Sequence, residues 1–334
     1  MSKKAIIIGS GISGLSSACF LAKEGWNVTV LEKNKTIGGR ARQFSEQGFV
    51  FDMGPSWYWM PDVFESFYQK FGYTTSDFYE LKRLDPSYRV YWSDQSYSDI
   101  PANMESLEAL FESLEPGSGL KLRSFLADAK YKYDVGMKDL VYKPSLKITE
   151  FIDLRLLKGL FSMDLTNSFS SYIRRYFKHP KLLSLLEFPV LFLGAMPKDT
   201  PALYSLMNYA DMELGTWYPM GGMYKFIEAF EKIARSLGVE IITDAEVKDV
   251  QKENGTVSLV KDIHDRSYAA DVFVSSADYH HTDKTLLNGS ANYSEKYWDK
   301  RIMAPSALLY YVGVNKRLTN VQHHNLLFDK SLLE

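Results

Sequence analysis

One glycine-rich stretch, Gly-Ser-Gly-Ile-Ser-Gly at residues 9–14, restricts the fold of this chain more than any other feature. It follows the apolar run Ile6–Ile8, which predicts a buried parallel strand, and it leads into a helix expected over about Ser13–Lys23. In this order the first glycine turns the chain, the second lets the backbone approach a pyrophosphate, and the third lets the helix pack against the strand. The stretch therefore predicts the opening turn of a dinucleotide-binding α/β domain.

The sequence NVTVLEK at residues 27–33 predicts a second strand that closes on Glu32. An acidic residue about 20 positions beyond such glycines accepts hydrogen bonds from a ribose 2′-hydroxyl, and its charge would repel a 2′-phosphate. NADP is therefore disfavoured. The cofactor-binding residues expected in this part of the chain are Gly9, Ser10, Gly11, Ile12, Ser13, Gly14, Glu32 and Lys33.

Two further glycine segments help to choose among the remaining dinucleotides. The segment Gly38–Ala41 (GGRA) indicates a second close approach of the backbone to the same ligand, and Arg40 could neutralise a diphosphate or stack on a ring. A minimal NAD domain has no need of this element. The strand-like sequence at residues 48–57 adds another glycine suited to tight approach. The cofactor-binding residues expected here are Gly38, Gly39, Arg40, Ala41, Gly54, Pro55 and Ser56.

Composition excludes several classes of protein. The net charge of the 334 residues is −2, so no global basic field points to nucleic acid. The chain's one cysteine, Cys19, cannot form an intrachain disulfide. The longest apolar run, residues 188–196, reaches half of the roughly 18 residues that a membrane-spanning helix needs. We therefore expect a globular protein with neither a membrane-spanning helix nor a nucleic-acid partner.

Together, the motifs G-x-G-x-x-G, E-K, G-G-R-A and F-D-x-G-P resemble the FAD-binding start of the flavin amine oxidase and carotenoid desaturase superfamily. Later segments resemble bacterial-type phytoene desaturases: Gly194–Pro197, Thr200–Tyr204, Gly215–Met223 and residues 274–282, where Ser276 replaces the usual Asn. The resemblance implies FAD as the cofactor. It implies stepwise desaturation of the long apolar isoprenoid phytoene toward lycopene, with hydride transfer from an allylic carbon to the flavin.

The same resemblance places the backbone of Val247 at the adenine, although Val247 could equally be a simple core residue of a strand. Residues 82–216 carry no phosphate-binding feature, and Gly221-Gly222 before a helix fits a return to the cofactor domain. We therefore predict an α/β fold with a discontinuous Rossmann-like FAD-binding domain and an inserted α+β substrate domain. The expected boundaries are 1–81 and 217–282 for the first, and 82–216 and 283–334 for the second.

Flavoproteins of this kind usually close the FAD site with a glycine-rich segment near the C-terminus. Nothing after Met223 resembles that segment, because the later glycines are isolated. The family's members are also appreciably longer. We therefore expect the sequence to be truncated at its C-terminal end, with weakened or lost FAD binding.

The candidates for catalysis are Asp153 and Arg155, which lie within an apolar run. A buried carboxylate beside an arginine could accept the proton that accompanies hydride loss, whereas a solvated helix face would explain the same charges without chemistry. The histidines occur as the adjacent doublets His280-His281 and His323-His324, which one helix or strand cannot easily direct at one metal. We expect no metal site.

Two apolar and basic segments, residues 140–163 and 174–181, could bind to the surface of an anionic lipid membrane. An apolar isoprenoid substrate would be collected from that membrane. The alternative is a domain core with basic edges. The expected location is therefore the cytoplasm, peripherally at the inner face of the cell membrane, with quinone or oxygen as the electron acceptor. Other readings of the function stay open: another carotenoid desaturase, a carotene isomerase, a flavin amine oxidase, or a non-enzymatic lipid-binding carrier of the same fold.

Overall fold

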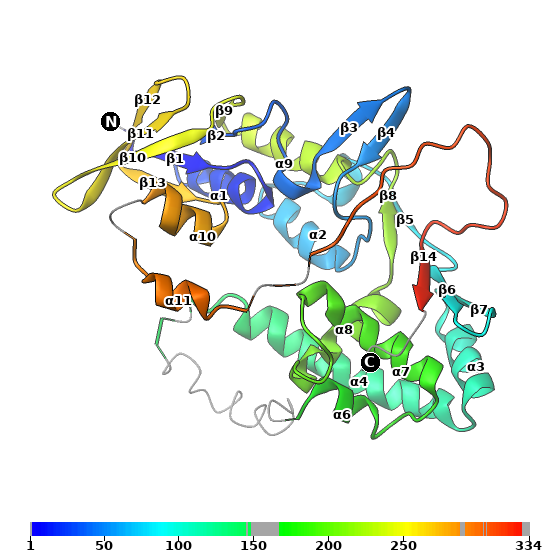
Figure 1. Cartoon of the computed structure of the whole chain (residues 1–334). Coiled ribbons are helices and arrows are strands. Elements are labelled where there is room, and N and C mark those ends of the chain that lie inside the picture. Colours follow the sequence, from blue (N-terminus) through cyan, green and yellow to red (C-terminus); the bar gives the residue numbers. More distant parts are fainter. Residues whose placement is uncertain are drawn as a thin grey trace. The chain divides into compact units, whose positions relative to one another are not determined.

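A computed structural model describes residues 2–144, 146–147, 167–287, 291–302, 304 and 306–328 (Figure 1). The chain divides into two compact units, and each is assembled from three separate segments. The first unit comprises Met1–Ser56, Phe64–Leu81 and Pro219–Ile302, and the second comprises Trp57–Val63, Lys82–Tyr218 and Met303–Glu334.

A four-stranded parallel sheet forms the centre of the first unit. Its strands follow the order β13 (Val272–Ser275), β1 (Lys4–Ile8), β2 (Asn27–Leu31) and β9 (Glu240–Ile242). Strand β1 pairs with β13 on one side and with β2 on the other, so it is central, and its residues Ala5–Ile8 are all buried. Such a strand is apolar along its length because both faces of a parallel sheet are covered. The sheet confirms the predicted Rossmann-like α/β fold.

Two helices of this unit pack against each other, α1 (Ile12–Lys23) and α9 (Lys225–Ser236). In α9 the buried residues recur every three to four positions, which is the spacing of one helix face. Helix α1 ends where Gly25 takes a φ of +84°, a left-handed conformation that favours glycine. The predicted first helix and its stop are therefore confirmed.

Smaller elements complete the first unit. A three-stranded antiparallel sheet contributes to a core in which Val247 and Val260 pack with Ile6 and Leu31. These elements are the hairpin of β3 (Gln43–Glu46) and β4 (Phe49–Asp52), the sheet of β10 (Val247–Glu253), β11 (Thr256–Asp262) and β12 (Ser267–Ala269), the helices α10 (Tyr279–His281) and α11 (Glu295–Asp299), and the single turns η1 (Gly39–Ala41), η2 (Thr75–Asp77) and η8 (Thr282–Leu286). Helix α2 (Pro61–Gln69) belongs to this unit from Phe64 onward.

The second unit combines helices with a three-stranded sheet in the order β14 (Asn325–Phe328), β6 (Tyr88–Trp92) and β7 (Tyr97–Ile100). Its core is rich in aromatic side chains such as Phe111 and Phe177. Two short strands, β5 (Leu81–Arg83) and β8 (Trp217–Pro219), lie where the chain passes from one unit to the other. The other elements are α3 (Met104–Leu114), α4 (Ser118–Val135), η3 (Gly136–Leu140), α6 (Phe169–Ile173), α7 (Pro180–Glu187), η5 (Phe188–Leu193), η6 (Ala202–Ser205), α8 (Leu206–Asn208) and η7 (Tyr209–Leu214).

The unit boundaries differ from the predicted ones at three places. Residues 217–218 belong to the second unit, so the first unit resumes at Pro219 and not at residue 217. Residues 57–63 belong to the second unit, where the Trp217 N–H donates to the carbonyl of Tyr58 at 3.1 Å. Residues 283–302 belong to the first unit, because the Asp283 carboxylate accepts the indole N–H of Trp298 at 2.9 Å and Leu286 enters the core of the unit. In the part of the chain that the structure describes, no helix has the length and apolarity needed to cross a bilayer.

Candidate cofactor site

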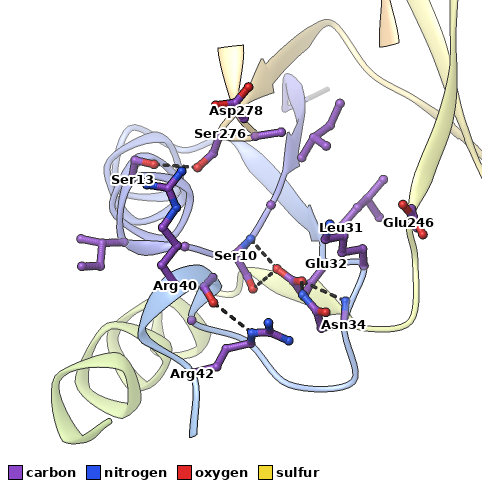
Figure 2. A pocket seen from close by; sticks show the side chains of 18 of the residues that line it. Ser10, Ser13, Leu31, Glu32, Asn34, Arg40, Arg42, Glu246, Ser276 and Asp278 are labelled. Carbon is purple, nitrogen blue, oxygen red and sulfur yellow. Dashed lines mark hydrogen bonds between the residues drawn. The ribbon is translucent and has the colours of Figure 1, made fainter. Parts of the chain in front are cut away.

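A cavity of about 1010 Å³ opens in the first unit where the parallel strands end (Figure 2). Its walls come from the loops after β1, β2 and β13, the start of α1, the turn η1 and the start of β10. Ligands of open α/β folds bind in the crevice outside the carboxyl ends of the strands. The volume is also at the upper end of the range for small-molecule and cofactor pockets.

Main-chain atoms form one wall of this cavity. A Cβ atom at Gly14 would lie 2.0 Å from the Gly9 carbonyl oxygen, so only glycine lets α1 pack this closely on the loop. A Cβ at Gly39 would lie 3.0 Å from the Cα of Gly11, and the Gly38 N–H donates to the Ser10 carbonyl at 3.0 Å. The two glycine segments therefore touch backbone to backbone. Together with the N-terminus of the twelve-residue helix α1, this surface suits a diphosphate.

The carboxylate of Glu32 is buried at the opposite edge of the loop. Its Oε2 accepts the Ser10 N–H at 2.9 Å and the Ser10 hydroxyl at 2.5 Å. Its Oε1 accepts the Asn34 N–H at 2.9 Å and the Asn34 side-chain Nδ2 at 2.5 Å (Figure 2). Burial by itself would raise the pKa of Glu32, but these hydrogen bonds together hold the pKa below its usual value. Glu32 is therefore ionised and fixed in position.

Cations and hydroxyls line the rest of the cavity. Arg40 extends from η1 into the site, while Arg42 donates from Nε to the Gly39 carbonyl at 2.9 Å and so holds the turn (Figure 2). The hydroxyls of Ser13 and Ser276 are 2.6 Å apart and join the start of α1 to the loop after β13. The site thus presents a positive charge near the main-chain cradle and an anionic acceptor on the other side of the loop.

Most predicted cofactor residues line this cavity. They are Gly9, Ser10, Gly11, Ile12, Ser13, Glu32, Lys33, Gly38, Gly39, Arg40, Ala41, Pro55 and Val247. Gly14, Gly54 and Ser56 lie outside the lining. Gly14 acts through packing, and so does Gly54, since a Cβ there would lie 2.3 Å from the Arg40 carbonyl oxygen. The predicted catalytic residues Asp153 and Arg155 fall outside the described residues.

Sequence reasoning left out the remaining lining residues, namely Ile8, Leu31, Asn34, Arg42, Ala245, Glu246, Ser276, Ala277, Asp278, His281 and Leu286. A signal existed for Ser276 and Ala277, because they lie within residues 274–282, one of the segments that resemble phytoene desaturases. No comparable pattern marks Asn34 or Glu246, whose placement depends on how the loops turn.

The histidine doublets have separate surroundings. In the first unit His280 contacts the ring of Trp298, while His281 lines the cavity. In the second unit the rings of His324 and Trp57 stack with their centroids 4.3 Å apart, and His323 lies beside another aromatic ring. Among the described residues, no group of three or more metal-ligating side chains comes together.

The second unit contains a buried polar network that the sequence did not predict. The hydroxyl of Tyr88 donates to Asp211 at 2.7 Å, and that of Thr216 lies 3.4 Å from the same carboxylate. The indole N–H of Trp59 in turn donates to the Thr216 hydroxyl at 2.8 Å. Burial raises the pKa of Asp211 to about 7, although the hydrogen bonds and the charge of Arg83 oppose the shift. The network holds two large aromatic rings in place.

The comparisons with known proteins agree with the fold. Residues 12–316 match the family of flavin-containing amine oxidoreductases. Because this match covers most of the chain, the protein belongs to that family. The match also confirms the predicted flavin cofactor.

Particular relatives point to one branch of this family. The chain is 38% identical over 323 residues to a carotenoid 3,4-desaturase of Haloarcula japonica, covering 96% of this chain and 65% of the relative. It is 29% identical over 328 residues to a zeta-carotene-forming phytoene desaturase of Myxococcus xanthus, covering 98% of this chain and 63% of the relative. The chain thus spans somewhat less than two thirds of the length of these relatives.

Among solved structures, an oxidoreductase from Methanosarcina mazei matches with a TM-score of 0.58 and 20% identity. The match covers 89% of this chain and 64% of that one. At this level of identity the likeness concerns the fold alone. It agrees with the α/β fold of this chain.

Proposed function

We propose that this chain belongs to an FAD-dependent carotenoid desaturase that converts phytoene toward lycopene. The observation that carries the proposal is the match of nearly the whole chain to carotenoid desaturases, at 38% and 29% identity. The dinucleotide-sized cavity with its main-chain cradle supports the flavin part of the proposal.

The residues of the cavity suggest how FAD would be held. The diphosphate would lie against Gly9–Gly14 and the Gly38-Gly39 pair, with Arg40 neutralising its charge. Glu32 would accept a ribose hydroxyl, and the backbone at Val247 would meet the adenine. Each of these groups is placed by a strand end or a glycine turn of the first unit.

Desaturation removes a hydrogen from each of two adjacent carbons and forms a double bond between them. The bound flavin would supply the acceptor for the hydride, and quinone or oxygen would later remove the two electrons. The other hydrogen leaves as a proton. For that proton, Asp153 with Arg155 as its neighbour stays the proposed acceptor. If Asp153→Asn leaves desaturation unchanged with FAD still bound, Asp153 has no part in the reaction.

Phytoene has no polar group, so the chain must orient it by shape and apolar contact. The second unit, with its aromatic core, is the proposed source of that apolar surface. A substrate of this kind resides in lipid, and we propose that the protein collects it at the cytoplasmic face of the membrane. Failure to co-sediment with anionic liposomes at low salt would count against this location.

A second candidate reaction is the desaturation of a different bond in a carotenoid that is already more unsaturated. The observation that favours it is the 38% identity of this chain to a carotenoid 3,4-desaturase. The chemistry at the flavin would be the same, and the two candidates would differ in which carbons reach it.

Expression in two bacterial hosts would separate these candidates, one accumulating phytoene and the other lycopene. The proposed function predicts new, more conjugated pigments in the phytoene host. Change in the lycopene host alone would favour the second candidate. Gly39→Val is the matched control, because its side chain would collide with the backbone of Gly11 and close the cradle. No new pigment in either host, with the protein expressed and flavin bound, would refute both.

A further inference from the structure

The hydrogen bonds of Glu32 raise a question about how a ribose reaches it. A carboxylate offers about four acceptor positions, two on each oxygen. Ser10 fills both positions on Oε2, and Asn34 fills both on Oε1. The chain itself therefore satisfies the carboxylate. A ribose hydroxyl can bond to Glu32 only by replacing one of these four donors.

The four donors differ in how easily they can leave. Two are backbone N–H groups of turns, and moving either would disturb the loop after β1 or the loop after β2. The Ser10 hydroxyl belongs to a fully buried residue, whose carbonyl accepts the Gly38 N–H. The Asn34 carboxamide differs from these three, because it lies half-buried at the margin of the cavity and lines it. It can rotate toward water and keep its hydrogen bonds there.

We propose that the side-chain amide of Asn34 competes with the adenosine ribose for Glu32, and so sets both the affinity of the site and its preference for a 2′-hydroxyl. This inference rests on the proposed FAD function. In it, the 2′-hydroxyl takes the place of Asn34 Nδ2 on Oε1, while the Ser10 donors and the Asn34 N–H remain. A nucleotide without the 2′-hydroxyl leaves Asn34 where it is.

The test combines removal of the Asn34 side-chain amide from the protein with removal of the 2′-hydroxyl from the ligand. Purified protein, the variant Asn34→Ala and the control Lys35→Ala are each titrated with ADP and with 2′-deoxy-ADP by calorimetry. Lys35 is exposed on the same loop and does not line the cavity, so it controls for a general effect of changing this loop. We expect Asn34→Ala to bind ADP tighter by about 3- to 10-fold, because a competing hydrogen bond to a charged group is gone. Its affinity for 2′-deoxy-ADP and both affinities of Lys35→Ala should not change.

Three results would overturn the proposal. Weaker binding of ADP alone would make Asn34 a direct ligand of the ribose. Equal weakening with both nucleotides would make it a structural residue of the loop. Equal affinities in the protein and Asn34→Ala would show that no competition exists.

A second measurement needs no variant. In the NMR spectrum of the protein, the side-chain amide signals of Asn34 should move on addition of ADP far more than on addition of 2′-deoxy-ADP. Equal movement with both contradicts the proposal. The desaturase proposal is tested separately: ADP discrimination without pigment formation would refute the desaturase alone, and pigment formation without discrimination would refute the role of Asn34 alone.

Discussion

At the scale of single residues, the glycines of the first unit differ in what they do. Gly14 has no room for a side chain, because a Cβ would lie 2.0 Å from the carbonyl oxygen of Gly9. Gly25, at the other end of α1, has nothing within 4 Å of a Cβ and is required only for its positive φ. Glycine is required at position 14 because of packing and at position 25 because of backbone conformation.

We predict that Gly14→Ala loses bound flavin and is destabilised by about 1–3 kcal/mol, since α1 must shift away from the loop. The matched control Gly25→Ala should be destabilised by roughly 1–2 kcal/mol and should keep flavin binding. Flavin absorbance of the purified variants and urea unfolding measure the two effects. Flavin retained at full stoichiometry in Gly14→Ala would contradict this reading of the loop.

Glu32 should also stabilise the fold. Its pKa is lowered in the folded state, so its stabilising effect is complete above the unfolded pKa near 4.5 and is lost as the pH falls through the lower folded value. Glu32→Gln should therefore be less stable than the protein by about 1–3 kcal/mol at pH 7, because an amide nitrogen would face several donors. Urea unfolding at several pH values should show this difference shrinking below pH 4.5. A difference that is independent of pH would contradict the assignment.

At the scale of elements, the buried network of the second unit connects β6 to the segment around β8. The carboxylate of Asp211 holds the hydroxyl of Tyr88, and through Thr216 it holds the indole of Trp59. Asp211 has a raised pKa, so between the ordinary value of 3.8 and about 7 the folded state keeps a proton that the unfolded state has released. The stability of the unit should therefore fall as the pH rises through this window.

With rising pH, the free energy of unfolding of the unchanged protein should decrease by roughly 2–4 kcal/mol through this window. We predict that Asp211→Asn removes most of this decrease. An asparagine oxygen can still accept from Tyr88, so the variant should keep its fold. Unfolding free energies at pH 5 and pH 8 measure the effect, with near-ultraviolet circular dichroism reporting on the rings. If the free energy of unfolding of the variant depends on pH as that of the unchanged protein does, other groups cause the decrease.

The elements of the first unit were predictable where the chain itself carries the signal. A β-branched run, three spaced glycines and a small-residue helix encode β1, the loop and α1 within residues 6–23. No sequence motif marks Asn34 as a partner of Glu32, although the two residues are only two positions apart, because the bond depends on how the loop after β2 turns. The same reason explains the boundary error at residues 283–302, where the bond from Trp298 to Asp283 joins residues that carry no recognisable pattern.

At the scale of the whole molecule, the cavity lies within one unit, so a nucleotide should act on the two units unequally. A ligand that binds only the folded state, and is present at a concentration 100 times its Kd, stabilises that state by about 2.7 kcal/mol. We predict that ADP slows hydrogen exchange at residues 9–14 and 38–41, and leaves α3 and α4 unchanged. Exchange mass spectrometry with peptides from both units measures this. Protection concentrated in α3 and α4 would place the nucleotide elsewhere.

The order of the strands has a consequence for synthesis of the protein. Strand β1 pairs with β13, and the N–H of Lys4 bonds to a carboxylate 267 positions later in the chain. At about 5–20 residues per second, a ribosome needs roughly 13–50 s to travel that distance. During this interval one edge of the central, buried strand β1 has no partner. An unpaired strand edge is a template for pairing with other polypeptides, so we expect the yield of folded protein to depend on how well this edge is protected during synthesis.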